Sequence, residues 1–290
     1  MDLVCERPVA SFGDATSFHP HFGGAVANVA VGAARRGAAV ALAGGVGDDA
    51  WGRWLRDRLE AEGVDLEWFR LLAGEPTPVA FVTVDAGGEP SFAIYGETIA
   101  AAVAALRPRL ADAVEACDAL FVTTNTMVGE VEREATLGAV RHARELGRPV
   151  VVDPNLRPAR WASAGQAVGA ARDLARGAFL VKCNRAEAEA LTGEREPARA
   201  AAGLLAGGAQ HVVVTLGAAG ALLRGEGGLR LDVPGVPARP RNATGAGDAV
   251  TGVLLAALGT SDFYAPALAA ALPDAVAEGA RATERWGAVA

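Results

Sequence analysis

The chain has 290 residues, of which 51% are hydrophobic and 21% are charged, a balance typical of a soluble globular enzyme and not of a disordered chain. Its formal net charge is −7, with no stripe of lysine or arginine, which argues against nucleic acid as a partner. We find no apolar run of the ~18 residues that a membrane helix needs, no signal-peptide pattern, and no metal-ligand spacing among the cysteines. We therefore expect a cytoplasmic protein that acts on a small molecule.

Helical and strand-like segments alternate along most of the chain. Helices are predicted at residues 24–36, 51–62, 130–146, 186–192 and 245–258. Strands are predicted at residues 38–43, 119–123, 149–153, 179–182 and 211–215. Apolar strands separated by helices are typical of a parallel sheet that is buried on both faces and built from βαβ units. We expect one α/β domain over residues 1–290.

Residues 77–95 interrupt this alternation. Two strand-like runs flank the sequence Asp85-Ala86-Gly87-Gly88, which is a β-hairpin signal. The segment is interpreted as a hairpin at the edge of a sheet or as a flap over a site.

The chemistry is expected at residues 242–248, Asn-Ala-Thr-Gly-Ala-Gly-Asp, which precede a strongly apolar helix. Small residues at Gly245, Ala246 and Gly247 allow a ligand close to the backbone, and the first amides of a helix attract an anion such as phosphate. Asp248 is then placed to accept the proton of an attacking hydroxyl, as phosphoryl transfer requires. The same pattern also fits a structural helix start in which Asp248 only stabilises the helix dipole.

Five sequence elements together resemble the PfkB (ribokinase-like) family. Residues 242–248 resemble its C-terminal signature D-T-x-G-A-G-D, and residues 23–28 with 44–52 resemble its N-terminal signature. Residues 153–157, 184–187 and 215–220 resemble its D-P-N-x-R, N-x-x-E and T-x-G-x-x-G elements. The chain is therefore identified as a member of this family of sugar kinases. The resemblance implies a three-layer α/β/α fold with a mostly parallel central sheet and a small β lid, whose strands are expected within residues 3–22 and 76–98.

The resemblance also implies roles for individual residues. Asp248 is expected as the general base, with Gly245, Ala246 and Gly247 forming the anion hole. The sugar is expected to meet Asp2, Gly24 and Asn28, and Arg157 is expected at the substrate or phosphate. For ATP, the expected residues are Asn184, Glu187, Thr215, Gly217 and Gly220, with Glu187 acting on Mg²⁺ through water. We also expect a homodimer formed through the lid.

The chain departs from the family pattern in two places that bear on function. The family opens with a strand that ends in a sugar-binding aspartate, and Asp2 matches that aspartate with almost no strand before it. We therefore expect the natural start to lie upstream of Met1. Asn242 stands where the family usually has an aspartate that helps to hold a monovalent cation. We expect activation by K⁺ to be weak or absent.

The substrate is less well determined by the sequence. Residues 92–98, Phe-Ala-Ile-Tyr-Gly-Glu-Thr, resemble the F-Y-x-E-x-T pattern of bacterial fructokinases. No arginine occurs between residues 77 and 98, so the lid lacks a bidentate clamp for a carboxylate. A neutral ketose, fructose first, is expected. The alternative is 2-keto-3-deoxygluconate, whose acid group Arg157 would serve. An alternative of another class is a catalytically silent protein that binds sugar or nucleotide.

A competing motif lies at residues 45–50, Gly-Val-Gly-Asp-Asp-Ala, which is close to a dinucleotide-binding fingerprint. Asp48 and Asp49 would face the pyrophosphate at the start of a helix, where like charges are unfavourable. We therefore expect no NAD site here.

Overall fold

The computed structural model describes residues 1–96 and 98–289. The chain folds as two compact units, each with its own internal packing. Unit 1 contains residues 1–102, residues 236–262 and the chain from Pro273 onward, whereas unit 2 contains residues 103–235 and 263–272. The sequence analysis expected one domain, and that expectation stays a prediction.

The helices and strands of unit 1 come from its widely separated segments. Its strands are β1 (Asp2–Pro8), β2 (His19–His21), β3 (Gly44–Gly47), β4 (Phe69–Leu72), β5 (Val79–Val84) and β6 (Pro90–Tyr95). Its helices are α1 (Ala25–Ala34), α2 (Ala50–Ala61) and α9 (Ala246–Gly259). Helices α3 (Thr98–Leu106) and α10 (Pro266–Thr283) each include residues of both units.

Unit 2 is built around one sheet. Its strands are β7 (Leu120–Thr123), β8 (Val150–Asp153), β9 (Leu180–Asn184), β10 (His211–Thr215), β11 (Ala221–Gly225) and β12 (Arg230–Val233). Its helices are α4 (Leu110–Glu115), α5 (Glu130–Glu145), α6 (Ala164–Ala175), α7 (Arg185–Thr192) and α8 (Pro197–Ala206).

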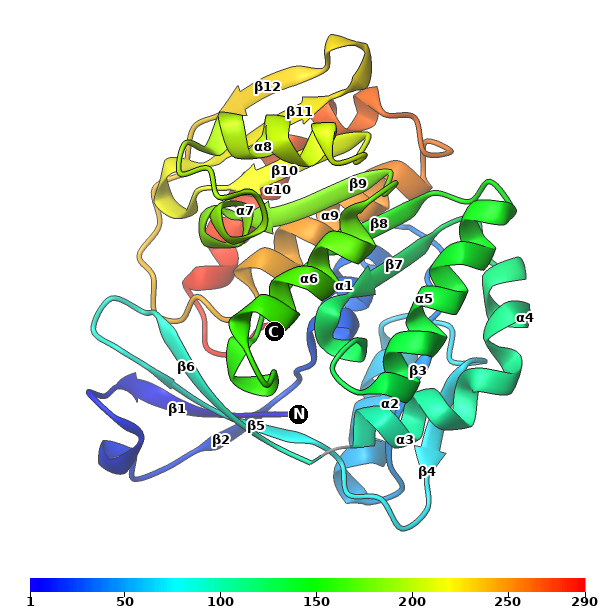
Figure 1. Cartoon of the computed structure of the whole chain (residues 1–290). Coiled ribbons are helices and arrows are strands. Elements are labelled where there is room, and N and C mark those ends of the chain that lie inside the picture. The colour runs from blue at the N-terminus through cyan, green and yellow to red at the C-terminus, as the bar shows by residue number, and fades with distance from the viewer. Residues whose placement is uncertain (97, 290) are drawn as a thin grey trace. The chain divides into compact units, whose positions relative to one another are not determined.

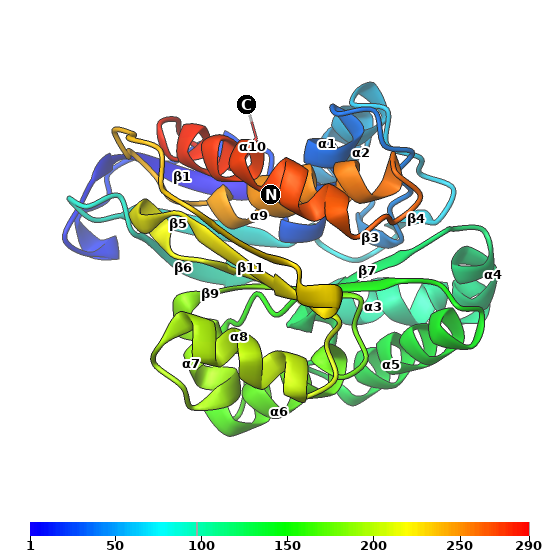
Figure 2. The ribbon, with the colours of Figure 1, turned by 90° about the horizontal axis from the view of Figure 1, so that it is seen from above.

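The sheet of unit 2 has the strand order β12-β11-β10-β9-β8-β7 (Figure 1). Strands β7 to β10 run parallel, and β11 and β12 are antiparallel to their neighbours. Helices α5 to α8 lie on one face of this sheet (Figure 2). Val151, Val181 and Val213 have no exposed surface, as expected for strands whose hydrophobic runs are buried on both faces. The predicted α/β class with a mostly parallel sheet is confirmed.

The second sheet, in unit 1, has the order β2-β1-β5-β6. Strands β5 and β6 pair antiparallel with Val82 opposite Phe92, so the hairpin predicted at residues 77–95 is confirmed. Asp85 closes its turn, because its carboxylate accepts hydrogen bonds from the backbone amides of Gly87 (2.8 Å) and Glu89 (3.0 Å). These four strands lie within residues 2–21 and 79–95.

One predicted strand was wrong. Residues 38–43 form no strand, and only Ala41 makes a single parallel bridge, to Asp65. The strand lies instead at Gly44–Gly47, where β3 pairs parallel with β4. A Cβ on Gly45 would lie 2.8 Å from the carbonyl oxygen of Arg70. Glycine, which has no Cβ, therefore allows the close approach of the two backbones that forms β3. This packing outweighs the strand propensity of the apolar residues at 38–43.

Two glycines of β3 provide a test of this packing. A Cβ on Gly47 would lie 2.1 Å from the carbonyl oxygen of Glu75, whereas a Cβ on Gly44 meets nothing within 4 Å. We expect Gly47→Ala to lower the free energy of unfolding by about 1–3 kcal/mol or more, since the clash is with backbone. Gly44→Ala should change it by less than about 0.5 kcal/mol. Urea denaturation measures both, and equal effects would contradict this account of β3.

Candidate active site

Unit 1 brings Asn28 and Asp248 together although they are 220 residues apart in sequence. The Asn28 side chain donates a hydrogen bond from Nδ2 to Oδ2 of Asp248, at 2.8 Å. Both side chains are buried, with 5% and 8% of their surface exposed. Asn28 lies in the first turns of α1, and Asp248 in the first turn of α9. The predicted sugar residue and the predicted base therefore share one site.

Helix α9 begins with backbone that only glycine accommodates. Gly245, its N-cap, has φ 78°, and a Cβ there would lie 2.4 Å from the Cβ of Ala288. The amides of the first helical turn have no partner within the helix and carry the positive end of its dipole. Gly245, Ala246 and Gly247 thus present main chain without bulky side chains. That arrangement suits a phosphate.

Asp2 and Gly24 complete this part of unit 1. Asp2 opens β1 and is 7% exposed. A Cβ on Gly23 would lie 2.3 Å from either carboxylate oxygen of Asp2, so the carboxylate packs directly against this backbone. Gly24 is the N-cap of α1 with φ 120°, and its carbonyl oxygen accepts from the amide of Asn28 at 2.8 Å.

Asn242 supplies no charge to a monovalent cation. The residue is fully buried, and its Oδ1 accepts a hydrogen bond from the amide of Thr244 at 2.9 Å. This bond assigns the other side-chain atom as Nδ2, which is a donor and has no partner among the described residues. The side chain therefore offers no negative charge, and its oxygen, which already accepts one hydrogen bond, keeps one further lone pair.

In unit 2, Asn184 and Glu187 form a capping box at the start of α7. Asn184 Oδ1 accepts from the amide of Glu187, and Glu187 Oε2 accepts from the amide of Asn184, each at 2.9 Å. The other carboxylate oxygen of Glu187 accepts from the amide of Leu156 at 2.8 Å. Both carboxylate oxygens of Glu187 already accept hydrogen bonds from backbone amides. The geometry therefore fits contact with Mg²⁺ through water better than direct coordination.

Sequence reasoning missed a buried ion pair beside Glu187. Lys182 Nζ lies 2.8 Å from Oδ2 of Asp153, and both side chains are almost fully buried. Burial raises the pKa of Glu187, and the Asp153 carboxylate raises it further, while Lys182 opposes both effects. The detectable signal was one lysine in the apolar strand β9 and one aspartate at the end of the neighbouring strand β8.

Asn155 belongs to the motif at residues 153–157, and the sequence predicted no separate role for it. It has φ 44°, is 9% exposed, and its Oδ1 has no hydrogen-bond partner in the described part of the chain. Its amide donates to Oδ1 of Asp153 at 3.1 Å. The loop after β8 is therefore held in a left-handed backbone conformation that asparagine tolerates better than most residues.

The remaining predicted residues of unit 2 lie at the ends of its strands and in the loops that follow. Thr215 ends β10 and is the register partner of Asn184 in β9. Gly220 has φ 100°, and a Cβ there would lie 2.0 Å from the carbonyl oxygen of Val233, so only glycine fits. Gly217 has φ 59° with open space around it. Arg157 donates from Nη1 to the carbonyl oxygen of Leu156 at 3.0 Å.

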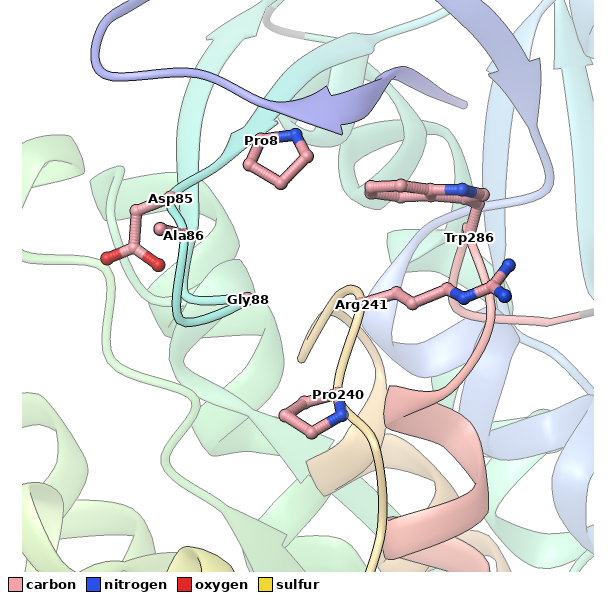
Figure 3. A pocket seen from close by; sticks show the side chains of 7 residues that line it. All are labelled: Pro8, Asp85, Ala86, Gly88, Pro240, Arg241 and Trp286. Atoms are coloured by element: carbon pink, nitrogen blue, oxygen red, sulfur yellow. The ribbon is translucent and has the colours of Figure 1, made fainter.

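The turn of the β5–β6 hairpin contacts the loop that leads to α9. The amide of Ala243 donates to the carbonyl oxygen of Gly88 at 2.9 Å. A hollow of about 230 Å³ lies at this junction (Figure 3). It is lined by Pro8, Asp85, Ala86, Gly88, Pro240, Arg241 and Trp286. None of these is a predicted site residue, and the hollow marks where the hairpin is tied to the loop.

The dinucleotide alternative does not fit the structure. The first amides of α2 are capped by Asp49, whose carboxylate accepts from Gly52 and from both the amide and the hydroxyl of Thr77. Burial alone would raise the pKa of Asp49, but these hydrogen bonds together lower it below its ordinary value. A fixed carboxylate therefore occupies the position that a pyrophosphate would need.

Comparison with known proteins places the chain in a family. Residues 4–285 match the model of the pfkB family carbohydrate kinases, so the chain belongs to this family and is a sugar phosphotransferase. It is 35% identical over 274 residues to a fructokinase from Klebsiella pneumoniae, covering 92% of this chain and 87% of the relative. It is 33% identical over 256 residues to fructokinase-1 from Oryza sativa subsp. japonica, covering 88% and 79%.

A solved structure supports the same placement. A double mutant of the fructokinase from Vibrio cholerae O395, with fructose, ADP and potassium ion bound, superposes with a TM-score of 0.84 at 28% identity, covering 99% of this chain and 90% of that one. The ribokinase-like fold class is confirmed. Within residues 1–96 and 98–289, no helix is long and apolar enough to cross a membrane.

The Lys182–Asp153 pair generates a prediction. Lys182→Met leaves buried carboxylates without their cation, so we expect a loss of about 3–5 kcal/mol in unfolding free energy near pH 8. Without Lys182 the pKa of Glu187 rises further above its unfolded value of about 4.3, and stability falls as pH rises through that window. The loss should therefore be smaller at pH 5, as measured by urea unfolding.

The matched control is the double variant Asp153→Asn with Lys182→Met, which removes both charges. It should be more stable than Lys182→Met alone, because no unpaired charge remains from the pair. A double variant that is less stable than the single one would show that the pair is not the main source of the loss.

Proposed function

We propose that this protein transfers the γ-phosphoryl group of ATP to a primary hydroxyl of fructose. The observation that carries the proposal is the Asn28–Asp248 hydrogen bond at the beginning of α9. It places a carboxylate next to helix amides that suit a phosphate and beside a side chain that suits a sugar hydroxyl. The fructokinases among the relatives support the choice of sugar.

In the proposed reaction, the γ-phosphate of ATP meets the amides of Ala246 and Gly247. Asp2 and Asn28 hold hydroxyls of the sugar. Asp248 takes the proton of the attacking hydroxyl as the bond from phosphorus to the sugar oxygen forms and the bond to ADP breaks. Amides placed where charge develops stabilise the transition state without reorganisation.

We assign the nucleotide to Asn184, Thr215, Gly217 and Gly220, and the sugar also to Gly24. Mg²⁺ bound to ATP offsets the charge of its phosphates, and Glu187 would hold this ion through water. We further propose that the sheet of β1, β2, β5 and β6 acts as the lid that excludes water from the site. The backbone bond from Ala243 to Gly88 supports this, because it ties the hairpin to the loop before the base.

A neutral ketose fits the site better than a sugar acid. Strands β5 and β6 contain no arginine, and Glu97 of the fructokinase-like pattern lies outside the described residues. The carboxylate of 2-keto-3-deoxygluconate would need Arg157, which lies outside these strands and uses one of its five N–H donors on the backbone of Leu156. A silent binding protein is disfavoured because a buried carboxylate at the start of α9 is costly to keep without a function.

The base role is tested by Asp248→Asn. We expect kcat to fall by roughly three orders of magnitude or more, since the amide cannot accept the proton. Mg-ATP consumption is assayed with fructose, 2-keto-3-deoxygluconate, ribose and adenosine, and circular dichroism checks the fold. Wild-type turnover of another sugar alone would replace fructose as the substrate. A folded variant with more than about a tenth of the activity would remove Asp248 from the base role.

The neutral side chain of Asn242 predicts a reaction that does not depend on potassium. Wild-type kcat should change by less than about twofold between 0 and 100 mM KCl at constant ionic strength. Asn242→Asp should gain K⁺ activation, because a carboxylate supplies the missing charge. N-methylglucamine chloride at equal concentration is the control. Strong, saturable activation of the wild type by K⁺ would contradict the prediction.

A further inference from the structure

Helices α1 and α9 approach each other closely at a pair of glycines. A Cβ on Gly252 would lie 3.1 Å from both Cα and the carbonyl carbon of Gly32, and 3.3 Å from the amide nitrogen of Ala33. These neighbours are backbone atoms of a helix, so they cannot move aside as a flexible side chain would. The two helices therefore approach each other so closely here that a Cβ on Gly252 would require the backbone to shift.

The two glycines lie one turn from the two polar residues of the site. Gly32 follows Asn28 by four positions in α1, and Gly252 follows Asp248 by four positions in α9, so each pair lies on one face of its helix. The contacts Asn28–Asp248 and Gly32–Gly252 occur in the same order along both helices. The helices thus run in the same direction, with both N-termini at the site.

Both glycines carry a cost in stability. Gly32 lies inside α1 and Gly252 inside α9, where glycine is less favourable than alanine. Neither has a positive φ, so backbone conformation does not require glycine at these positions. At Gly252 an added Cβ would force the facing backbone of α1 to shift by roughly a few tenths of an ångström.

We propose that Gly32 and Gly252 are positioning residues, which set the spacing between Asn28 and Asp248. This inference rests on the proposed function, because it treats Asp248 as the base and Asn28 as its partner. An asparagine side chain is short and its reach is fixed. A few tenths of an ångström of added separation between the helices therefore lengthens the 2.8 Å bond toward the limit of a good hydrogen bond and weakens its hold on the carboxylate.

Three alanine substitutions separate this role from general packing. Gly252→Ala introduces the 3.1 Å backbone contact, whereas a Cβ on Gly32 meets only Cα of Gly252 at 3.5 Å. On Gly259, at the end of the same helix α9, a Cβ meets only the Cβ of Ala38, at 3.8 Å. We expect kcat to fall roughly tenfold or more in Gly252→Ala, less in Gly32→Ala, and not measurably in Gly259→Ala. KM for ATP should stay within about twofold in all three.

A compensating variant distinguishes positioning from loss of packing. Gln is one methylene longer than Asn, so Asn28→Gln should span the wider gap created by Gly252→Ala. The double variant should recover at least about threefold in kcat over Gly252→Ala, although Asn28→Gln alone lowers kcat. If Gly252→Ala does not fold, Gly32→Ser takes its place and is rescued in the same way. Absence of rescue in a folded double variant would overturn the proposal.

A crystal structure of Gly252→Ala tests the geometry independently of activity. We expect the distance between Asn28 Nδ2 and Asp248 Oδ2 to lengthen from 2.8 Å by roughly a few tenths of an ångström or more. A bond that stays at 2.8 Å would overturn the positioning role, whatever the kinetics show. Failure of the proposed function gives a different result, because the wild type itself would then not phosphorylate any of the sugars.

Discussion

The site depends on close packing around helix α9. Its first turn must present bare amides, so the backbone before it takes the left-handed conformation of Gly245 against Ala288. Its flank must approach α1 closely enough for a short side chain to reach Asp248. Gly279 of α10 adds a third close approach, where a Cβ would lie 2.8 Å from Val250. Small residues around α9 thus determine where Asp248, which comes late in the chain, meets residues from the beginning of the chain, such as Asn28.

The two units handle buried charge in different ways. In unit 1, Asp248 receives a hydrogen bond from the neutral amide of Asn28. In unit 2, Asp153 is paired with Lys182, and Glu187 is held by two backbone amides. Buried charges that are paired and hydrogen-bonded in this way keep a loop in one conformation. This second arrangement holds the loop after β8, because the amides of Asn155 and Leu156 donate to Asp153 and Glu187.

Local patterns in the sequence were sufficient for much of this structure. The hairpin, the individual apolar strands and the start of α9 each depend on residues that are neighbours in sequence, such as the turn at Asp85 or the glycines before Asp248. Features that depend on register between distant segments were not predictable. Lys182 meets Asp153 only because β8 and β9 pair as they do. The strand at Gly44–Gly47 was missed because glycine is a poor strand former and is used there for its small size.

The order of segments along the chain has a consequence for biosynthesis. Most of unit 2 is one continuous stretch, residues 103–235, whereas unit 1 needs residues from both ends of the chain. During translation one packing partner of α1, helix α9, does not exist until the chain has grown past Asp248, 220 residues after Asn28. At 5–20 residues per second this delay is roughly 10–40 s. Throughout it, Val31 can already pack with Leu42, Leu55 and Leu59, but the face of α1 that will meet α9 at Gly32 lacks its native cover. That face of the nascent chain is therefore a site where a chaperone could bind.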